Sequence, residues 1–358
     1  YVKGAGVPGD PVIKDMTIRY DGSVNMAFSG TSYIGLVAGY AEHTSFQNIK
    51  VLANLSIDTT TRPNAGGIAG YISNNTEITN CHVSGGIIGD FANTAYDVGG
   101  IVGFAHLSSI TKASFTGNLD VTNTAGSGGA GGIIGFGNGG QISSCYASAK
   151  IEARGAPAAS VYAGGIAGQI NSTGSGEGVI KACYAWVLVT AGGGSANYNH
   201  AGGIAGSMDN PVTNYPSISG SYARGTVKAV NDAVTSAYAG GIAEGNVGNI
   251  AGCIALNDRI ESSASSDVHG IAGHGSGTYS NNYAASGITF VRSAFTPNVG
   301  LDGITTKAYA DFRGSANVGN YPSAYWNFAV NGDWRWINGY DYPVLAWQTT
   351  APRDPATL

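Results

Sequence analysis

The sequence predicts an all-β fold, a parallel β-helix of about eight coils. A glycine-flanked apolar box of five residues returns eight times, and its last positions lie 31, 33, 32, 33, 38, 38 and 29 residues apart. Such a period is typical of one supersecondary unit stacked many times. Between the boxes, short stretches alternate apolar and polar residues, which indicates half-buried strands. The boxes are 35–39 (GLVAG), 66–70 (GGIAG), 99–103 (GGIVG), 131–135 (GGIIG), 164–168 (GGIAG), 202–206 (GGIAG), 240–244 (GGIAE) and 269–273 (HGIAG).

Composition excludes several classes of protein. Gly makes up 57 of the 358 residues, but it has no period of three and Pro is only 11, so the chain is not collagen. Net charge is −5 and no basic cluster occurs, which argues against nucleic acid as a partner. No apolar run approaches the ~20 residues that span a bilayer, so we expect no direct membrane insertion. The start at Tyr1 predicts a trimmed mature fragment.

The repeat divides the chain into four parts. Residues 1–32 lack it and are expected to cap the first coil, because the end of a β-helix exposes unpaired strand edges. Residues 33–308 hold the coils, which we expect to be right-handed. In each coil the glycine pairs should mark bends that need positive φ and a close approach of neighbouring backbones, which only Gly allows. After the box comes an Ile followed by a corner, as in 78–81 (ITNC), and then another short strand, as in 117–121 (GNLDV).

The C-terminal part differs sharply in composition. Residues 309–348 are rich in large aromatic side chains, and we expect them to form a bulky plug that caps the last coil, followed by a tail at 349–358. The aromatic residues are Trp326, Phe328, Trp334, Trp336, Tyr340, Tyr342 and Trp347.

The boxes, with 35–39 (GLVAG) the closest match, resemble the GLUG repeat, and 334–348 (WRWINGYDYPVLAWQ) is similar to the segment that often closes GLUG arrays. The resemblance implies a secreted or surface-displayed bacterial protein, commonly adhesin-like. GLUG regions also accompany immunoglobulin A1 peptidases of the zinc kind, whose catalytic signature is HExxH. None of the six histidines here is followed by Glu, so no peptidase residue can be carried over.

Four cysteines, Cys81, Cys145, Cys183 and Cys253, occupy one repeat position. An inward column of small residues explains them better than metal or redox chemistry. Parallel side chains on neighbouring coils also fit the disulfide dihedral angle poorly. We therefore expect free, buried thiols, with no metal and no cofactor.

Two aromatic columns are candidate binding surfaces. One position after the cysteines stand Tyr146, Tyr184, Tyr222 and Tyr283, and the polar members of this column indicate that it faces outward. A second column, two residues before the boxes, holds Tyr162, His200 and Tyr238. Stacked aromatic rings on a solenoid face are suited to a host glycan or glycoprotein. The alternative is that they only stabilise the sheet by stacking from coil to coil beneath loops.

Asp120 and Glu152 are the candidate catalytic residues. They hold the same outward position on adjacent coils, as the paired carboxylates of β-helix polysaccharide lyases and glycosidases do. No Lys or Arg is expected to stack beside them, and a repelling pair of surface carboxylates is the simpler interpretation.

These observations favour a non-enzymatic, extracellular bacterial module, adhesin-like or a spacer, expected to be a monomer. One alternative is the accessory region of an immunoglobulin A1 peptidase whose catalytic domain lies outside this chain. The other is a β-helix enzyme that acts on glycans through Asp120 and Glu152.

Overall fold

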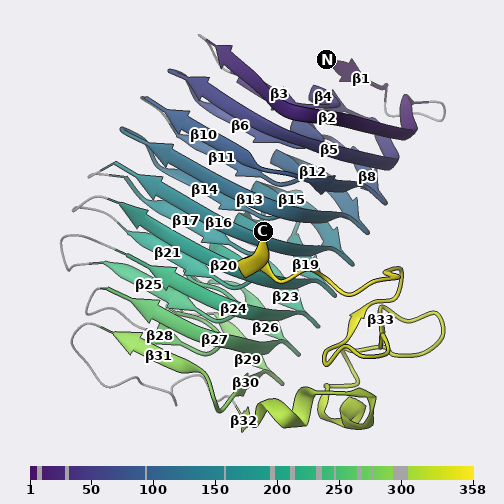
Figure 1. The fold of residues 1–358 in the computed structure, drawn as a ribbon, viewed down its shortest axis with the longest axis vertical. Helices are drawn as coiled ribbons and strands as arrows, with labels where there is room; N and C mark the ends of the chain where they lie inside the picture. Colours follow the sequence, from purple (N-terminus) through teal and green to yellow (C-terminus); the bar gives the residue numbers. More distant parts are fainter. Residues whose placement is uncertain are drawn as a thin grey trace.

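The computed structural model describes residues 1–5, 10–28, 32–92, 95–156, 159–193, 198–209, 214–230, 236–245, 247–263, 268–273, 275, 277–292 and 305–358. These residues form a parallel β-solenoid of about eight turns (Figure 1). Each turn supplies strands to three successive parallel ladders, whose neighbouring strands lie one repeat apart in the sequence. The predicted fold class is confirmed.

The first ladder is an eight-stranded sheet that leads into the boxes. Its register pairs Gly35 with Gly66 and continues coil by coil to Gly240 and His269, so the expected line of box glycines is confirmed. The strands are β3 (Ser32–Gly35), β6 (Pro63–Gly66), β11 (Tyr96–Gly99), β14 (Gly128–Gly131), β17 (Val161–Gly164), β21 (Asn199–Gly202), β25 (Ala237–Gly240) and β28 (Val268–His269).

The second ladder follows the boxes and ends at the Ile motif. Where the connection is short, one strand covers the whole face; elsewhere a loop divides it. The strands are β4 (Ala38–Glu42), β7 (Ala69–Ser73), β8 (Glu77–Thr79), β12 (Val102–Thr111), β15 (Ile134–Ser143), β18 (Ala167–Asn171), β19 (Gly178–Lys181), β22 (Ala205–Asp209), β23 (Ser217–Ser219), β26 (Asn249–Ala251) and β29 (Thr278–Ser280).

The third ladder carries the longest alternating strands. Its inward residues are mostly small or β-branched, and its outward residues are mostly polar or aromatic. The strands are β5 (Ser45–Thr59), which also covers the end of the second face, β9 (His82–Ser84), β10 (Ile87–Phe91), β13 (Ser114–Asn123), β16 (Tyr146–Gly155), β20 (Tyr184–Gly193), β24 (Tyr222–Ala229), β27 (Ile254–Ser262), β30 (Tyr283–Ala285), β31 (Thr289–Arg292) and β32 (Thr305–Lys307).

Close packing of the backbone explains the box glycines. A Cβ on Gly99 would lie 2.0 Å from the carbonyl oxygen of Val102 and 2.7 Å from that of Ile133 in the next coil. No described box glycine has a positive φ, so the expectation that these bends need one is wrong. The tight turn points the third box residue inward, and this residue is fully buried in seven coils: Ile68, Ile101, Ile133, Ile166, Ile204, Ile242 and Ile271.

Positive φ angles occur instead at the corner between the second and third ladders. There φ lies between 49° and 63° in successive coils, in the left-handed region that Asn, Asp and Gly adopt at the lowest cost. The corner turns the chain immediately before the cysteine column. Its residues are Asp15, Asn48, Asn80, Lys112, Ser144, Ala182, Gly220, Gly252 and Asn281.

The N-terminal residues extend the ladders rather than forming a separate unit. β1 (Val2–Lys3) pairs in parallel with β4, and β2 (Val12–Phe28) pairs in parallel with β5 along most of its length. The described strands of this N-terminal part, β1 and β2, thus cover the strand edges of the first coil by continuing the same pairing, and most of their described side chains are exposed.

The C-terminal segment, residues 309–358, lies in a different place from the expected plug. Figure 1 shows it leaving the last coil and running back along one flank of the solenoid. It holds the 3₁₀ turns η1 (Tyr309–Phe312), η2 (Ser315–Asn320) and η3 (Pro355–Thr357), and a small antiparallel pair, β33 (Trp334–Arg335) and β34 (Val344–Leu345). The physical reason is that its rings pack on the outward tyrosine column, whereas Ile, Ala and Cys already fill the interior.

Candidate functional site

The first aromatic column is stacked but covered. Ring centroids of Tyr146 and Tyr184 lie 5.1 Å apart, and those of Tyr184 and Tyr222 lie 4.9 Å apart, with nearly parallel planes. Tyr184 and Tyr222 are fully buried, and burial raises the pKa of both phenols. The column faces outward as predicted, but these two rings are not open to a ligand.

The cover over this column is the C-terminal segment. The side-chain amide of Gln348 donates a hydrogen bond to the Tyr184 hydroxyl (2.7 Å), and the Tyr222 hydroxyl donates to the carbonyl of Pro343 (2.8 Å). The indole N–H of Trp326 donates to the carbonyl of Gly252 (2.7 Å). These bonds attach the segment to several coils along the flank.

A groove begins where this cover ends. It has a volume of about 540 Å³ and lies between the first coils of the third ladder and residues 347–353; we call it the flank groove. Tyr146, which is half-buried, stands at one end. Its ring lies 5.7 Å from that of Trp347, which also stacks on His82 at 5.1 Å. The sequence had grouped Tyr146 with the other tyrosines, but only the tertiary structure separates it from them.

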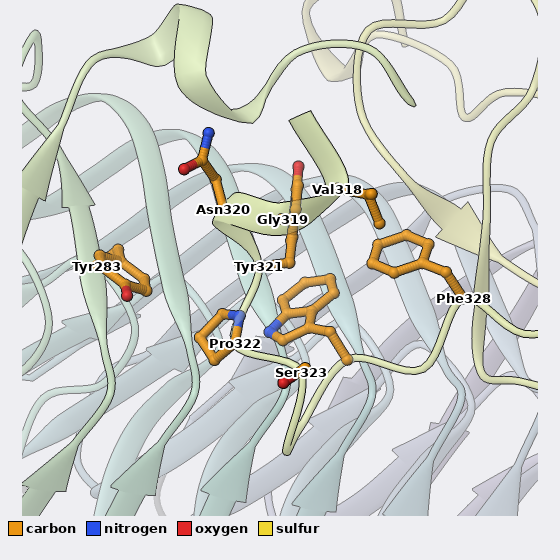
Figure 2. A pocket seen from close by; sticks show the side chains of 9 residues that line it. Tyr283, Val318, Gly319, Asn320, Tyr321, Pro322, Ser323 and Phe328 are labelled. Atoms are coloured by element: carbon orange, nitrogen blue, oxygen red, sulfur yellow. The ribbon is translucent and has the colours of Figure 1, made fainter. Parts of the chain in front are cut away.

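A second cavity, of about 530 Å³, lies where η2 passes the last coils. Figure 2 shows Tyr283 on one side and Phe328 on the other, with Pro322 between them. Its main polar groups already have partners, since Asn320 accepts from Lys307 (2.9 Å) and the Tyr321 hydroxyl donates to the Phe312 carbonyl (2.6 Å). We interpret this cavity as a packing seam.

The second aromatic column forms a stack with a buried carboxylate beneath it. His200 lies between Tyr162 (4.8 Å) and Tyr238 (5.7 Å), measured between ring centroids. Nδ1 of His200 contacts the carboxylate of Glu244, which replaces the last glycine of its box and is fully buried. All three rings are partly exposed, and burial raises the pKa of Tyr162. Because stacking and the contact with Glu244 fix the orientation of the His200 ring, this column forms a rigid surface.

A third aromatic column was missed in the sequence. The residue after the box is aromatic in the first four coils, and Tyr40, Tyr71, Phe104 and Phe136 stack with centroids 5.1, 4.9 and 5.0 Å apart. Tyr33 packs against the rings of Tyr40 and Tyr71. We call these five residues the box-corner stripe. The signal was visible as GLVAGY, GGIAGY, GGIVGF and GGIIGF.

The candidate catalytic carboxylates are neutralised by neighbouring cations. Arg154 donates to Asp120 (2.6 Å) and to Glu152 (2.7 Å), and Lys150 lies 3.1 Å from Glu152. Burial tends to raise the pKa of Glu152, but the hydrogen bonds from Lys150 and Arg154 outweigh it and hold the pKa below its usual value. The expectation of a repelling pair without a nearby Lys or Arg is wrong, because Arg154 lies on the same strand two positions further on.

The four cysteines are free and buried, as predicted. Burial raises the pKa of Cys81 to about 11 and that of Cys253 to about 12. In the described part of the chain, His, Cys, Asp and Glu form no cluster of three or more that could hold a metal ion. Nor does any described helix have the length and apolar character needed to cross a membrane.

Comparison with known proteins identifies one coil directly. Residues 62–88 match the GLUG motif. This GLUG coil contains the box at 66–70 and the left-handed corner at Asn80. The chain is also similar to the crystal structure of a "putative immunoglobulin A1 protease" from Bacteroides ovatus, with 24% identity, a TM-score of 0.50, and coverage of 78% of this chain and 86% of that chain. At this identity the likeness shows a shared fold. No curated protein matches the chain.

Proposed function

We propose that this chain is a non-catalytic, extracellular binding module of a bacterial surface protein, adhesin-like, and that the box-corner stripe binds a host glycan or glycoprotein. The observation that carries the proposal is a continuous row of stacked rings that stays partly exposed, with Tyr33 exposed to 41%. The tyrosine column on the flank, in contrast, is covered by the chain's own C-terminal segment.

The surroundings of the stripe suit a sugar. His106 and Asn138 follow Phe104 and Phe136 by two residues, so they lie on the same outward face and are partly exposed. Aromatic faces provide apolar contact area, and nearby polar groups can hydrogen-bond to hydroxyls. The ladder also holds the row rigid, because each ring sits on a strand paired to the next coil.

The test is binding of the purified chain to immobilised glycans and to mucin-type glycoproteins. The double variant Tyr71→Ala/Phe104→Ala should weaken binding at least tenfold, which corresponds to about 1.4 kcal/mol. The matched control is Ile88→Ala, which removes a side chain that is 55% exposed on the third ladder. Circular dichroism should show both variants folded. Absence of binding by the unaltered chain, or full binding by the double variant, would refute the proposal.

A second candidate is the accessory region of an immunoglobulin A1 peptidase. The GLUG match and the name of the similar structure from Bacteroides ovatus favour it. In that case the full-length gene product should contain a separate HExxH domain. The present chain alone should leave immunoglobulin A1 intact, and cleavage by this chain would contradict a purely accessory role.

A further inference from the structure

We propose that the flank groove binds an anionic sugar unit that carries a carboxylate. This inference rests on the proposed function, that the chain is a glycan-binding module, and adds a second site with a different ligand chemistry. The groove lies on the third ladder and not at the box corner, so the two sites can be altered separately.

The floor of the groove consists of two adjacent outward columns. Lys50, His82 and Ser114 are in register on successive coils, and Tyr146 follows on the next coil. Leu52, Ser84 and Thr116 form the parallel column two residues further on. The wall is the stretch 347–353 of the C-terminal segment. At about 540 Å³ the groove has the size of small-ligand sites and accommodates a short oligosaccharide.

The charged residues that line the groove are all positive. The groove residues include Lys50 and Arg353 but no Asp or Glu, although the whole chain has a net charge of −5. Both cationic side chains are exposed, and within the described residues neither forms a salt bridge. Two cations without a protein carboxylate favour an anionic ligand.

A fixed polar network lies in the floor of the groove. Asn80 donates its amide N–H to Asn48 (2.8 Å), so its oxygen is the acceptor for Nε2–H of His82 (3.1 Å). Nδ1 of His82 then accepts from the Ser114 hydroxyl (2.9 Å). Burial, with the charge of Lys50, lowers the pKa of His82 and so favours the neutral ring. Lys50 and Arg353 therefore carry the positive charge of the groove.

Trp347 supplies the apolar contact. Its indole N–H donates to the Ser144 carbonyl (2.9 Å), and its ring stacks on His82 and Tyr146, so its orientation is fixed. The ring remains partly exposed at the groove. A rigid aromatic ring beside hydroxyl and amide groups suits the mixed apolar and polar faces of a sugar.

The test compares sialyllactose with lactose, which differ by the acidic sugar, in calorimetric titrations of the full chain. We expect sialyllactose to bind at least tenfold more tightly, with an affinity that falls as salt increases. Lys50→Gln/Arg353→Gln should lower that affinity at least tenfold and leave lactose binding unchanged. Lys14→Gln is the control, because it removes an exposed charge on β2, outside the groove.

The possible outcomes separate this inference from the proposed function. Equal binding of the two sugars, or an unaffected Lys50→Gln/Arg353→Gln variant, overturns the groove proposal. If glycans still bind and Tyr71→Ala/Phe104→Ala abolishes that binding, the stripe proposal stands by itself. Trp347→Ala should also lower the affinity for sialyllactose, and Trp347→Phe should restore part of it.

Discussion

At the scale of single residues, the cysteine column is a set of hydrogen-bonding groups as well as a set of small side chains. The Cys183 thiol donates to the Ile142 carbonyl of the preceding coil (3.7 Å) and accepts from the Cys145 N–H (3.4 Å). In the next coil Ser221 accepts from the Cys183 N–H (3.0 Å). The column thus satisfies backbone groups at a corner where the regular ladder is interrupted.

Cys183→Ser should therefore be better tolerated than Cys183→Ala. The serine hydroxyl should still accept from the Cys145 N–H, as Ser221 accepts from the Cys183 N–H. It can also donate to a carbonyl of its own coil, as Ser221 donates to that of Ser219. Alanine leaves the buried Cys145 N–H without this acceptor and should cost about 1–2 kcal/mol in the free energy of unfolding. Urea unfolding measures the difference. Equal losses for the two variants would show that only the size of the side chain matters.

The thiols should be inert in the native state. Burial raises the pKa of Cys81 to about 11 and of Cys253 to about 12, so the reactive thiolate is scarce at pH 8. A thiol reagent should modify all four cysteines only after denaturation. Rapid modification of the native chain would contradict the buried column.

The buried carboxyl group of Asp97 makes the stability of the fold depend on pH. Burial raises its pKa to about 6, against the opposing charge and hydrogen bond of Arg62. Because the pKa of Asp97 is higher in the folded state, its protonated form adds to the free energy of unfolding. This contribution is fully present below the pKa of the unfolded state and is lost as pH rises through about 6. Asp97→Asn should then stabilise the chain by about 2 kcal/mol at pH 7.5 and hardly at all below pH 4. Asn64 holds the equivalent position in the preceding coil. Thermal melting across this pH range is the measurement, and a pH-independent effect would contradict the ionised, buried carboxylate.

At the scale of elements, the left-handed corner between the second and third ladders is the most demanding backbone position. Lys112 adopts φ 54° there, where the preceding coil uses Asn80 and a later coil uses Gly220. Lys112→Gly should stabilise by about 1 kcal/mol, because an L-residue with a Cβ is strained in this region. Lys112→Ala keeps the Cβ and is the control. If the two variants have the same melting temperature, the increase in stability does not come from relief of backbone strain.

At the scale of the whole molecule, the C-terminal segment determines which surfaces are open. A chain that ends at residue 307 should expose Tyr184 and Tyr222, bind a hydrophobic dye and aggregate. A chain that ends at Gln348 keeps the cover and should melt close to the full chain. It loses residues 349–353 of the groove wall, including Arg353, and should therefore lose the binding of sialyllactose. A soluble, unchanged solenoid ending at residue 307 would show that the cover is dispensable.

The fold could be predicted from the sequence because the contacts of a solenoid are mostly between adjacent repeats. Each coil contacts mainly its neighbours, so the recurring boxes and the Ile motif determined the period, the inward residues and the alignment of glycines from Gly35 to Gly240. The buried thiols followed from the same register. The left-handed corner at Asn80 recurs as well, but its residue type varies from coil to coil, so the repeat does not mark it in the sequence.

The proposed binding surfaces could be located only in the tertiary structure. Tyr146, Tyr184 and Tyr222 are equivalent in the repeat, and only the path of the C-terminal segment leaves the first at a groove and buries the other two. Residues 347–353 are far from Lys50 in sequence, so no period relates them. The sequence by itself determined what recurs from coil to coil, whereas the tertiary structure decided what lies over those coils, because contacts of a non-repeating segment are set by packing and not by register.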